Sequence, residues 1–129
     1  MSPVFRQLAW FIAVGCAAAG THWLIVVLLV TLLSLPPLIA NVIGWLVAFI
    51  VSFSGHFLLT FRHQHAPPAR AARRFFAVSA AGFAVNELSY AWLLHTTAWR
   101  YDVLLALVLI AIAVATFIVG RLWAFQGRR

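Results

Sequence analysis

The stretch SLPPLIANVIGWLVAFIVSFSGHFLLTF, residues 34–61, points to the fold class of this chain. It opens on a turn with a Pro pair and continues as an apolar run that carries no Asp, Glu, Lys or Arg until Arg62 follows it. A transmembrane helix needs about 20 predominantly apolar residues, and the run over 38–61 is long enough. The Pro pair marks a tight turn after an earlier apolar run. The stretch therefore predicts the second helix of a membrane-spanning hairpin.

The composition of the whole chain indicates the same class. Of the 129 residues, 65% are hydrophobic and 9% are charged, and the mean hydropathy is +1.03, whereas about a quarter of the residues in a soluble domain are charged. Four apolar runs cover about 8–33, 38–61, 75–94 and 103–125, and the basic, Pro-containing segment 62–74 reads as a loop. Because backbone polar groups must be satisfied inside the bilayer, we expect one all-α integral membrane domain over residues 1–129, with four transmembrane helices.

The distribution of positive charge predicts the orientation. The net charge of +7 comes from nine arginines and no lysine. Only Arg100, beside Asp102, falls on the side opposite to the termini, and such a bias marks the cytoplasmic face. We therefore expect a multi-pass membrane protein with both termini cytoplasmic. Since the charges sit at the ends of apolar runs, they indicate membrane orientation and anionic lipid contact rather than nucleic-acid binding.

The chain also contains a weak internal repeat. SFSGHFLLTF (52–61) and TFIVGRLWAF (116–125) share a layout in which Phe53, Leu58 and Phe61 correspond to Phe117, Leu122 and Phe125. Each half of the chain is then a two-helix hairpin that starts and ends in the cytoplasm. Such halves are parallel repeats, related by an axis along the membrane normal.

Small and polar residues follow helical spacing in these runs. The second helix carries them at intervals of 3, 4, 4 and 3: Asn41, Gly44, Ala48, Ser52 and Gly55. Small residues let neighbouring helices approach closely, so we expect packing seams here and also at Gly15, Gly82 and Ala113.

Polar and ionisable residues within the runs are the candidates for function, because they are costly in hydrocarbon. His22 and Glu87 fall near the middle of their spans, where they could form an ion pair or share a proton, and Glu87 paired with His22 or Asn86 could equally be a structural clasp. The candidates for a polar substrate groove are His22, Asn41, Ser52, His56, Asn86 and Glu87. The candidates for phosphate binding are Arg62, Arg73, Arg74 and Arg121, since guanidinium groups bind phosphate bidentately.

Catalytic and metal-binding patterns are absent from the sequence. It has only two carboxylates, no Ser-His-acid set in a suitable polar context and no Gly-rich nucleotide loop. We therefore expect no enzyme activity, no catalytic residue, no cofactor and no metal. The motif HQH at 63–65 reads as part of a solvated loop.

The segments FIAVG, LPPLIANVIGWLVAFIVSFSGHFLLTFR and TFIVGRLWAF resemble the GtrA-like family of small four-helix membrane proteins. The clearest part is the pattern of Pro37, Ala40, Asn41 and Gly44, and the resemblance covers nearly the whole chain. It implies translocation of polyprenyl-phosphate-linked sugars across the bacterial inner (plasma) membrane for cell-surface polysaccharide synthesis, beside a membrane glycosyltransferase partner. The chain departs from the family pattern at His22, where an acidic residue is common, and at His56-Phe57, where an Asn-Arg pair is common.

Three functions remain open at this level. The first is a translocase (flippase) of polyprenyl-phosphate-linked sugar, in which the polar groove passes the headgroup and the arginines collect the phosphate. The second is a non-transporting scaffold for a polyprenyl-phosphate glycosyltransferase. The third is a small drug exporter, which the arginine bias disfavours because dual topology needs balanced loops. A homo-oligomer is compatible with each, and the sequence does not select the sugar.

Overall fold

The computed structural model describes residues 2–60 and 67–126, apart from the side chains of residues 68, 71, 117 and 119–126. These residues form α1 (Pro3–Leu33), α2 (Pro37–Gly55), the short π-helical segment η1 (His56–Thr60) that continues α2, α3 (Pro68–Thr96) and α4 (Tyr101–Gln126). No strand occurs within the described ranges. The four helices are those expected from the apolar runs, and the chain is an all-α membrane protein.

The start of α1 and its turn to α2 are fixed by local chemistry. Ser2 caps the helix, with its Oγ accepting from the Phe5 N–H at 3.3 Å, and a proline occupies the first turn. At the other end Ser34 adopts a left-handed conformation (φ 53°), and the Leu35 N–H donates to the Leu29 carbonyl at 3.2 Å. The Ser34 N–H donates to the same carbonyl, so the end of α1 closes on Leu29.

The start of α3 departs from the prediction of a loop over 62–74. The helix begins at Pro68, after the extended Pro67, so its first two turns lie within that segment. Proline is favoured in the first helical turn, where its missing N–H costs nothing, and alanine and arginine, which follow it, are good helix formers. The prediction of a loop is therefore wrong for residues 68–74. Phe61 and the remaining residues to Ala66 lie outside the described ranges.

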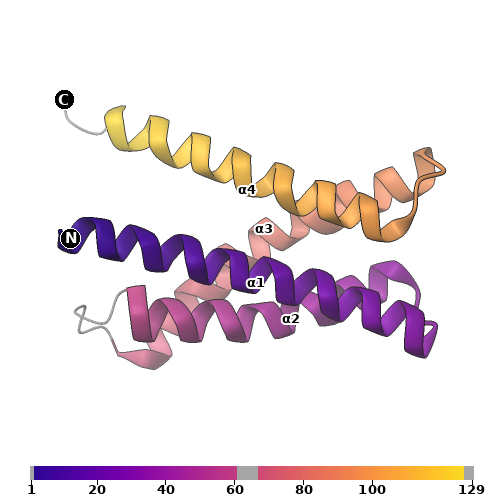
Figure 1. Cartoon of the computed structure of the whole chain (residues 1–129), viewed down its shortest axis with the longest axis horizontal. Coiled ribbons are helices and arrows are strands. Elements are labelled where there is room, and N and C mark those ends of the chain that lie inside the picture. The colour runs from indigo at the N-terminus through magenta and orange to yellow at the C-terminus, as the bar shows by residue number, and fades with distance from the viewer. Residues whose placement is uncertain (1, 61–66, 127–129) are drawn as a thin grey trace.

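The helices form two antiparallel hairpins, as Figure 1 shows. α1 pairs with α2, and α3 pairs with α4. The start of α1, the end of α2, the start of α3 and the end of α4 lie at one end of the bundle, which we call the terminal end. The turns over 34–36 and 97–100 lie at the opposite end, which we call the turn end. Both hairpins thus start and end on the same side, as the parallel repeat implied.

The first hairpin is closely packed because α2 presents glycine to α1. A Cβ at Gly44 would lie 2.8 Å from Val26 Cγ2 and 3.0 Å from the His22 carbonyl oxygen, and one at Gly55 would lie 2.6 Å from Val14 Cγ1. These two glycines confirm the seam predicted on α2. The seams predicted elsewhere are wrong for this arrangement of the helices. A Cβ at Gly15 or Gly82 would meet nothing within 4 Å, and Ala113 is exposed.

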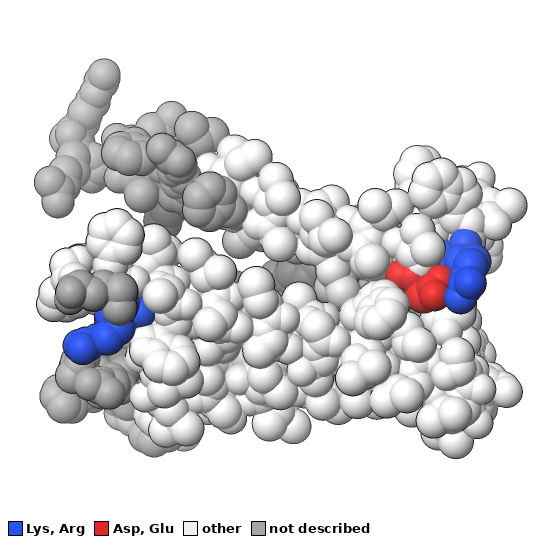
Figure 2. Space-filling view, viewed as in Figure 1, with Lys and Arg blue, Asp and Glu red and all other residues white. Residues whose placement is uncertain are grey.

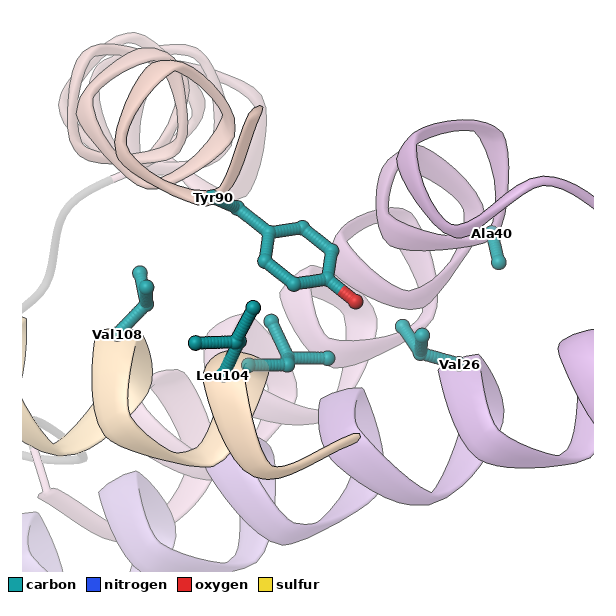
Figure 3. Close-up of a cluster of buried hydrophobic side chains, with 6 residues drawn as sticks. Val26, Ala40, Tyr90, Leu104 and Val108 are labelled. Carbon is teal, nitrogen blue, oxygen red and sulfur yellow. The ribbon is translucent and has the colours of Figure 1, made fainter. Parts of the chain in front are cut away.

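The hydrophobic core lies toward the turn end and joins all four helices. It consists of Val26, Ala40, Tyr90, Leu104, Leu105 and Val108, each no more than 4% exposed. Figure 3 shows Tyr90 extending from α3 toward Leu104 of α4 and Val26 of α1. Two hydrogen bonds close this region: the Trp23 indole donates to the Asp102 carbonyl at 2.9 Å, and the Tyr90 hydroxyl donates to the Tyr101 carbonyl at 3.0 Å.

Most apolar side chains of the first hairpin face outward. Pro3–Leu33 and Pro37–Thr60 are long and apolar enough to cross a membrane, yet only 17% of the most apolar window of each is buried within the bundle. Tyr101–Thr116 of α4 is a shorter apolar helix. Since a soluble protein would bury such helices, the outward-facing apolar surface fits a lipid environment.

Candidate functional site

A chain of buried polar side chains links α1, α2 and α3 near the middle of the bundle. The His22 Nε2 lies 2.6 Å from the Asn41 Oδ1, and the Asn41 Nδ2 donates to the Asn86 Oδ1 at 2.7 Å. Because an amide oxygen only accepts, His22 donates through Nε2. All three residues are at most 5% exposed. The close approach of α1 at Gly44 brings His22 to α2 and makes the chain possible. We call His22, Asn41 and Asn86 the polar chain.

Glu87 lies beside the polar chain and is the group there with unmet hydrogen-bonding capacity. Both of its carboxyl oxygens are buried, and neither has a hydrogen-bond partner among the described residues. The Asn41 amide is close enough to interact with the carboxyl, but the contact does not reach hydrogen-bonding geometry. An uncompensated buried charge costs several kcal/mol, so a carboxyl in this position is a candidate for function rather than for packing.

The pairing expected between His22 and Glu87 is replaced by a different one. The partner of His22 is Asn41, which stands between α1 and α3 and bonds to both neighbours. The sequence placed His22 and Glu87 at similar depths, but it did not show that α2 inserts an amide between the two helices. The interaction expected between Glu87 and Asn86 is also absent from the hydrogen bonds of the described chain.

Ser52 and His56 lie further along α2, toward the terminal end. Ser52 is half-buried, and His56 is buried in η1 with its Nδ1 3.0 Å from the Thr60 Oγ1. The His56 ring packs against Phe11 of α1 and Phe75 of α3, with centroids 5.0 and 5.8 Å apart. From Asn41 to Ser52 the helix rises by about 16 Å. The six groove candidates therefore form two groups: the polar chain with Glu87, and the pair nearer the terminal end.

The arginines gather at the terminal end. Arg73 and Arg74 are exposed on the first turns of α3, and Arg6 and Arg70 are exposed on α1 and α3. Arg62 and the side chain of Arg121 lie outside the described residues. Figure 2 shows basic side chains at the terminal end and, at the turn end, acidic and basic side chains together. The latter are Arg100 and Asp102, whose Nη2 and Oδ2 are 3.0 Å apart. We call Arg6, Arg70, Arg73 and Arg74 the basic end.

Three contacts between helices were not foreseen from the sequence. The indole groups of Trp23 and Trp45 donate across helix boundaries, Trp45 to the Ser79 Oγ at 2.8 Å, and Tyr90 joins α3 to α4. Aromatic residues are common in any apolar run, so nothing in the sequence singled these out. Buried indole and phenol groups usually find a partner, and this rule alone could have suggested them. No group of three metal-binding side chains occurs among the described residues.

Together these observations define the class: a small four-helix membrane protein with a buried polar chain at mid-depth and a basic end. The comparison with protein families makes the assignment more specific. The family model described as the GtrA/DPMS transmembrane domain matches residues 10–125, and the chain belongs to this family. The family connects it to membrane functions that involve polyprenyl-phosphate sugars. Neither the search of curated proteins nor that of solved structures returned a significant match.

Proposed function

We propose that this protein translocates polyprenyl-phosphate-linked sugars from the cytoplasmic to the outer leaflet of the bacterial inner membrane, for synthesis of cell-surface polysaccharide or glycolipid. The observation that carries the proposal is the Glu87 carboxyl beside the polar chain, which has no hydrogen-bond partner among the described residues, in a protein whose basic end suits an anionic lipid. Family membership supplies the class of lipid.

The physical problem for such a protein is the passage of a sugar and a phosphate through about 30 Å of hydrocarbon. Arginines at the membrane surface attract anionic headgroups and bind phosphate bidentately. At mid-depth, Glu87 has two buried oxygens with no hydrogen-bond partner among the described residues, and sugar hydroxyls could satisfy them. A hydrogen bond from a sugar hydroxyl to Glu87 would lower the energy barrier to passage of the headgroup, because the hydrocarbon core holds no water that could bind the hydroxyl instead. The isoprenoid tail would stay in lipid throughout.

The alternative is a non-transporting scaffold for a polyprenyl-phosphate glycosyltransferase. The polar chain itself favours this reading, because His22, Asn41 and Asn86 already bond to one another and could serve as a structural clasp between three helices. Under this reading Glu87 is dispensable as long as the bundle folds. In either case the glycosyltransferase is the proposed partner, and a homo-oligomer remains compatible with the fold.

The test is a reconstituted translocation assay. Purified protein in liposomes receives a fluorescent polyprenyl-phosphate sugar, and an impermeant quencher reports how fast the inner-leaflet pool becomes accessible. The proposal expects faster exchange than in protein-free liposomes and in liposomes that hold a helical membrane protein of similar size. Exchange equal to both controls, from protein that remains folded, rejects the translocase and leaves the scaffold.

A further inference from the structure

The two halves of the bundle differ in how α4 is held. At the turn end, α4 contributes three buried residues to the core: Leu104, Leu105 and Val108. Trp23 of α1 and Tyr90 of α3 also donate to the carbonyls of its first two residues. Among the described side chains of α4 beyond Val108, none is buried. Figure 1 shows α4 diverging from α1 toward the terminal end. α4 is therefore anchored at the turn end alone, in the part of the chain that can be described.

The face of α1 that meets α4 continues beyond the contact. Ile12, Cys16, Ala19 and Trp23 follow one another at intervals of 4, 3 and 4, so they share one face of the helix. Trp23 bonds to α4 and Ala19 is half-buried, but Cys16 is exposed and Ile12 is 54% exposed. One continuous helix face thus packs on α4 at the turn end and lies uncovered toward the terminal end.

One stripe of α4 shows the same change in burial along its length. Leu104, Val108, Ile112 and Ala115 fall at intervals of 4, 4 and 3. The first two are buried, Ile112 is half-buried and Ala115 is exposed. Both stripes therefore become more exposed in the same direction, from the turn end toward the terminal end.

α3 borders the same region. A pocket of about 220 Å³ lies between α3 and α4, with Ser89 and Leu93 on α3 and Leu107, Val108, Ala111 and Ile112 on α4. By its position along α4, it lies where the buried residues give way to the exposed ones. We use the name lateral opening for three features together: the exposed face of α1 at Ile12 and Cys16, the stripe of α4 at Ile112 and Ala115, and this pocket.

The charge of the neighbouring basic end indicates which kind of ligand the lateral opening could bind. The lateral opening lies between the core and the basic end, whose four arginines pair with no carboxylate among the described residues, because Glu87 and Asp102 lie elsewhere. A lipid with an apolar tail and an anionic headgroup matches both features. A second copy in the same orientation would place its own basic end beside this one, and like charges repel.

We infer that the lateral opening is the site at which the tail of an anionic polyprenyl-phosphate lipid enters the bundle from the cytoplasmic leaflet, with its phosphate at the basic end. The isoprenoid identity rests on the proposed function, whereas the location and the charge rest on the structure. The pocket at Ser89 is the deepest point the tail reaches, since the hydrogen-bonded core blocks the way beyond it.

Cys16 offers a direct test, because it is the single cysteine of the chain and is exposed on the face of the lateral opening. Alkylation of Cys16 by a lipid-soluble maleimide is followed in nanodiscs that contain undecaprenyl phosphate, undecaprenol or phosphatidic acid. With undecaprenyl phosphate about ten times above its dissociation constant, we expect alkylation about tenfold slower. Undecaprenol and phosphatidic acid should leave the rate unchanged.

Each other outcome overturns the inference in a defined way. Equal protection by phosphatidic acid means a general anionic-lipid surface, and equal protection by undecaprenol means an apolar face without charge selection. Protection that grows with protein concentration in the absence of added lipid means that a second copy covers the face. No protection by any lipid means that the opening is not a binding site.

A second variant separates this inference from the proposed function. Ala115→Trp fills the lateral opening from an exposed position, and Ile50→Trp on α2, at a residue that is 64% exposed, is the matched control. Ala115→Trp should reduce photo-cross-linking to a diazirine-bearing polyprenyl phosphate about tenfold, because site occupancy falls in proportion to affinity. Ile50→Trp should leave the cross-linking unchanged. Full cross-linking and translocation by Ala115→Trp overturn the site but leave the translocase intact. If the lipid protects Cys16 but the protein does not translocate, the binding site is supported and the translocase is rejected.

Discussion

His22 of α1 and Asn41 of α2 are joined by a 2.6 Å contact between the imidazole Nε2 and the amide Oδ1, and both side chains are buried. Asn41 also donates to Asn86 of α3, so one amide on α2 holds the other two helices. Two residues that are 19 positions apart in the chain meet here because Gly44, one turn after Asn41, leaves room for α1.

Removal of the Asn41 amide should destabilise the bundle. Asn41→Leu keeps a similar volume but deprives His22 and Asn86 of their shared partner, and a buried polar group left unsatisfied costs about 1–3 kcal/mol. Unfolding in mixed micelles measures the loss. The neighbouring Val42→Leu, at a residue that is 39% exposed, is the control and should change stability by less than about 0.5 kcal/mol. Equal stability of both variants would show that the polar chain contributes nothing to folding.

Glycine substitutions should divide according to the space around each Cβ. Gly44→Ala forces a Cβ to within 2.8 Å of Val26 Cγ2, and overpacking costs about 1–3 kcal/mol. Gly15→Ala meets nothing within 4 Å and should be neutral or stabilising by up to about 1 kcal/mol, because alanine is the better helix former. Thermal unfolding in detergent compares the two. The packing of α1 on α2 requires Gly44→Ala to be less stable than Gly15→Ala, and the reverse order would contradict it.

Glu87→Gln should slow translocation and leave the fold intact. The substitution keeps the shape of the side chain but replaces one acceptor oxygen with an NH2 donor and removes the ionisable group beside Asn41. We expect translocation about 10 to 100-fold slower, the range for loss of one to two strong polar contacts at about 1.4 kcal/mol per decade. Normal rates from both Glu87→Gln and Glu87→Ala, with normal folding, would favour the scaffold.

The basic end should affect lipid handling rather than folding. Arg73 and Arg74 are exposed and pair with no carboxylate in the described chain. Changing both to Ala should weaken binding of polyprenyl phosphate by about 2 kcal/mol, at about 1 kcal/mol per surface charge, with unfolding unchanged. Arg100→Ala at the turn end is the control for lost positive charge. Loss of membrane insertion or an inverted orientation would mean that these arginines act as topology signals.

The orientation can be tested on a Cys16→Ser background. A cysteine at exposed Ala69, on the first turn of α3, should react with a membrane-impermeant maleimide in inverted vesicles but not in spheroplasts. A cysteine at Trp99, which is 63% exposed at the turn end, should show the reverse pattern. Labelling of the Ala69 position in spheroplasts would contradict the cytoplasmic placement of the termini.

Local chemistry made much of the fold predictable. Long apolar runs and the prolines at 36 and 37 predicted four helices and the first turn. The spacing from Asn41 to Gly55 predicted the face of α2 that packs on α1. The same reasoning was wrong for residues 68–74, because polarity was weighed above the helix propensity of alanine and arginine. The candidate polar residues were recognised one by one, since each is unusual in hydrocarbon.

The sequence by itself determined the class of protein, the number of helices and the end at which the arginines gather, because hydrophobicity, turn residues and charge act locally along the chain. Only the tertiary structure decided that His22 pairs with Asn41 rather than Glu87, and that α4 has buried side chains near the turn end and none among its described residues beyond Val108. The physical reason is that a helical stripe specifies which side chains share a face but not the rotation or the crossing angle of the helix that meets it. Gly44 and Gly82 look alike in the sequence, and only the position of the neighbouring helix makes one a contact and leaves the other open.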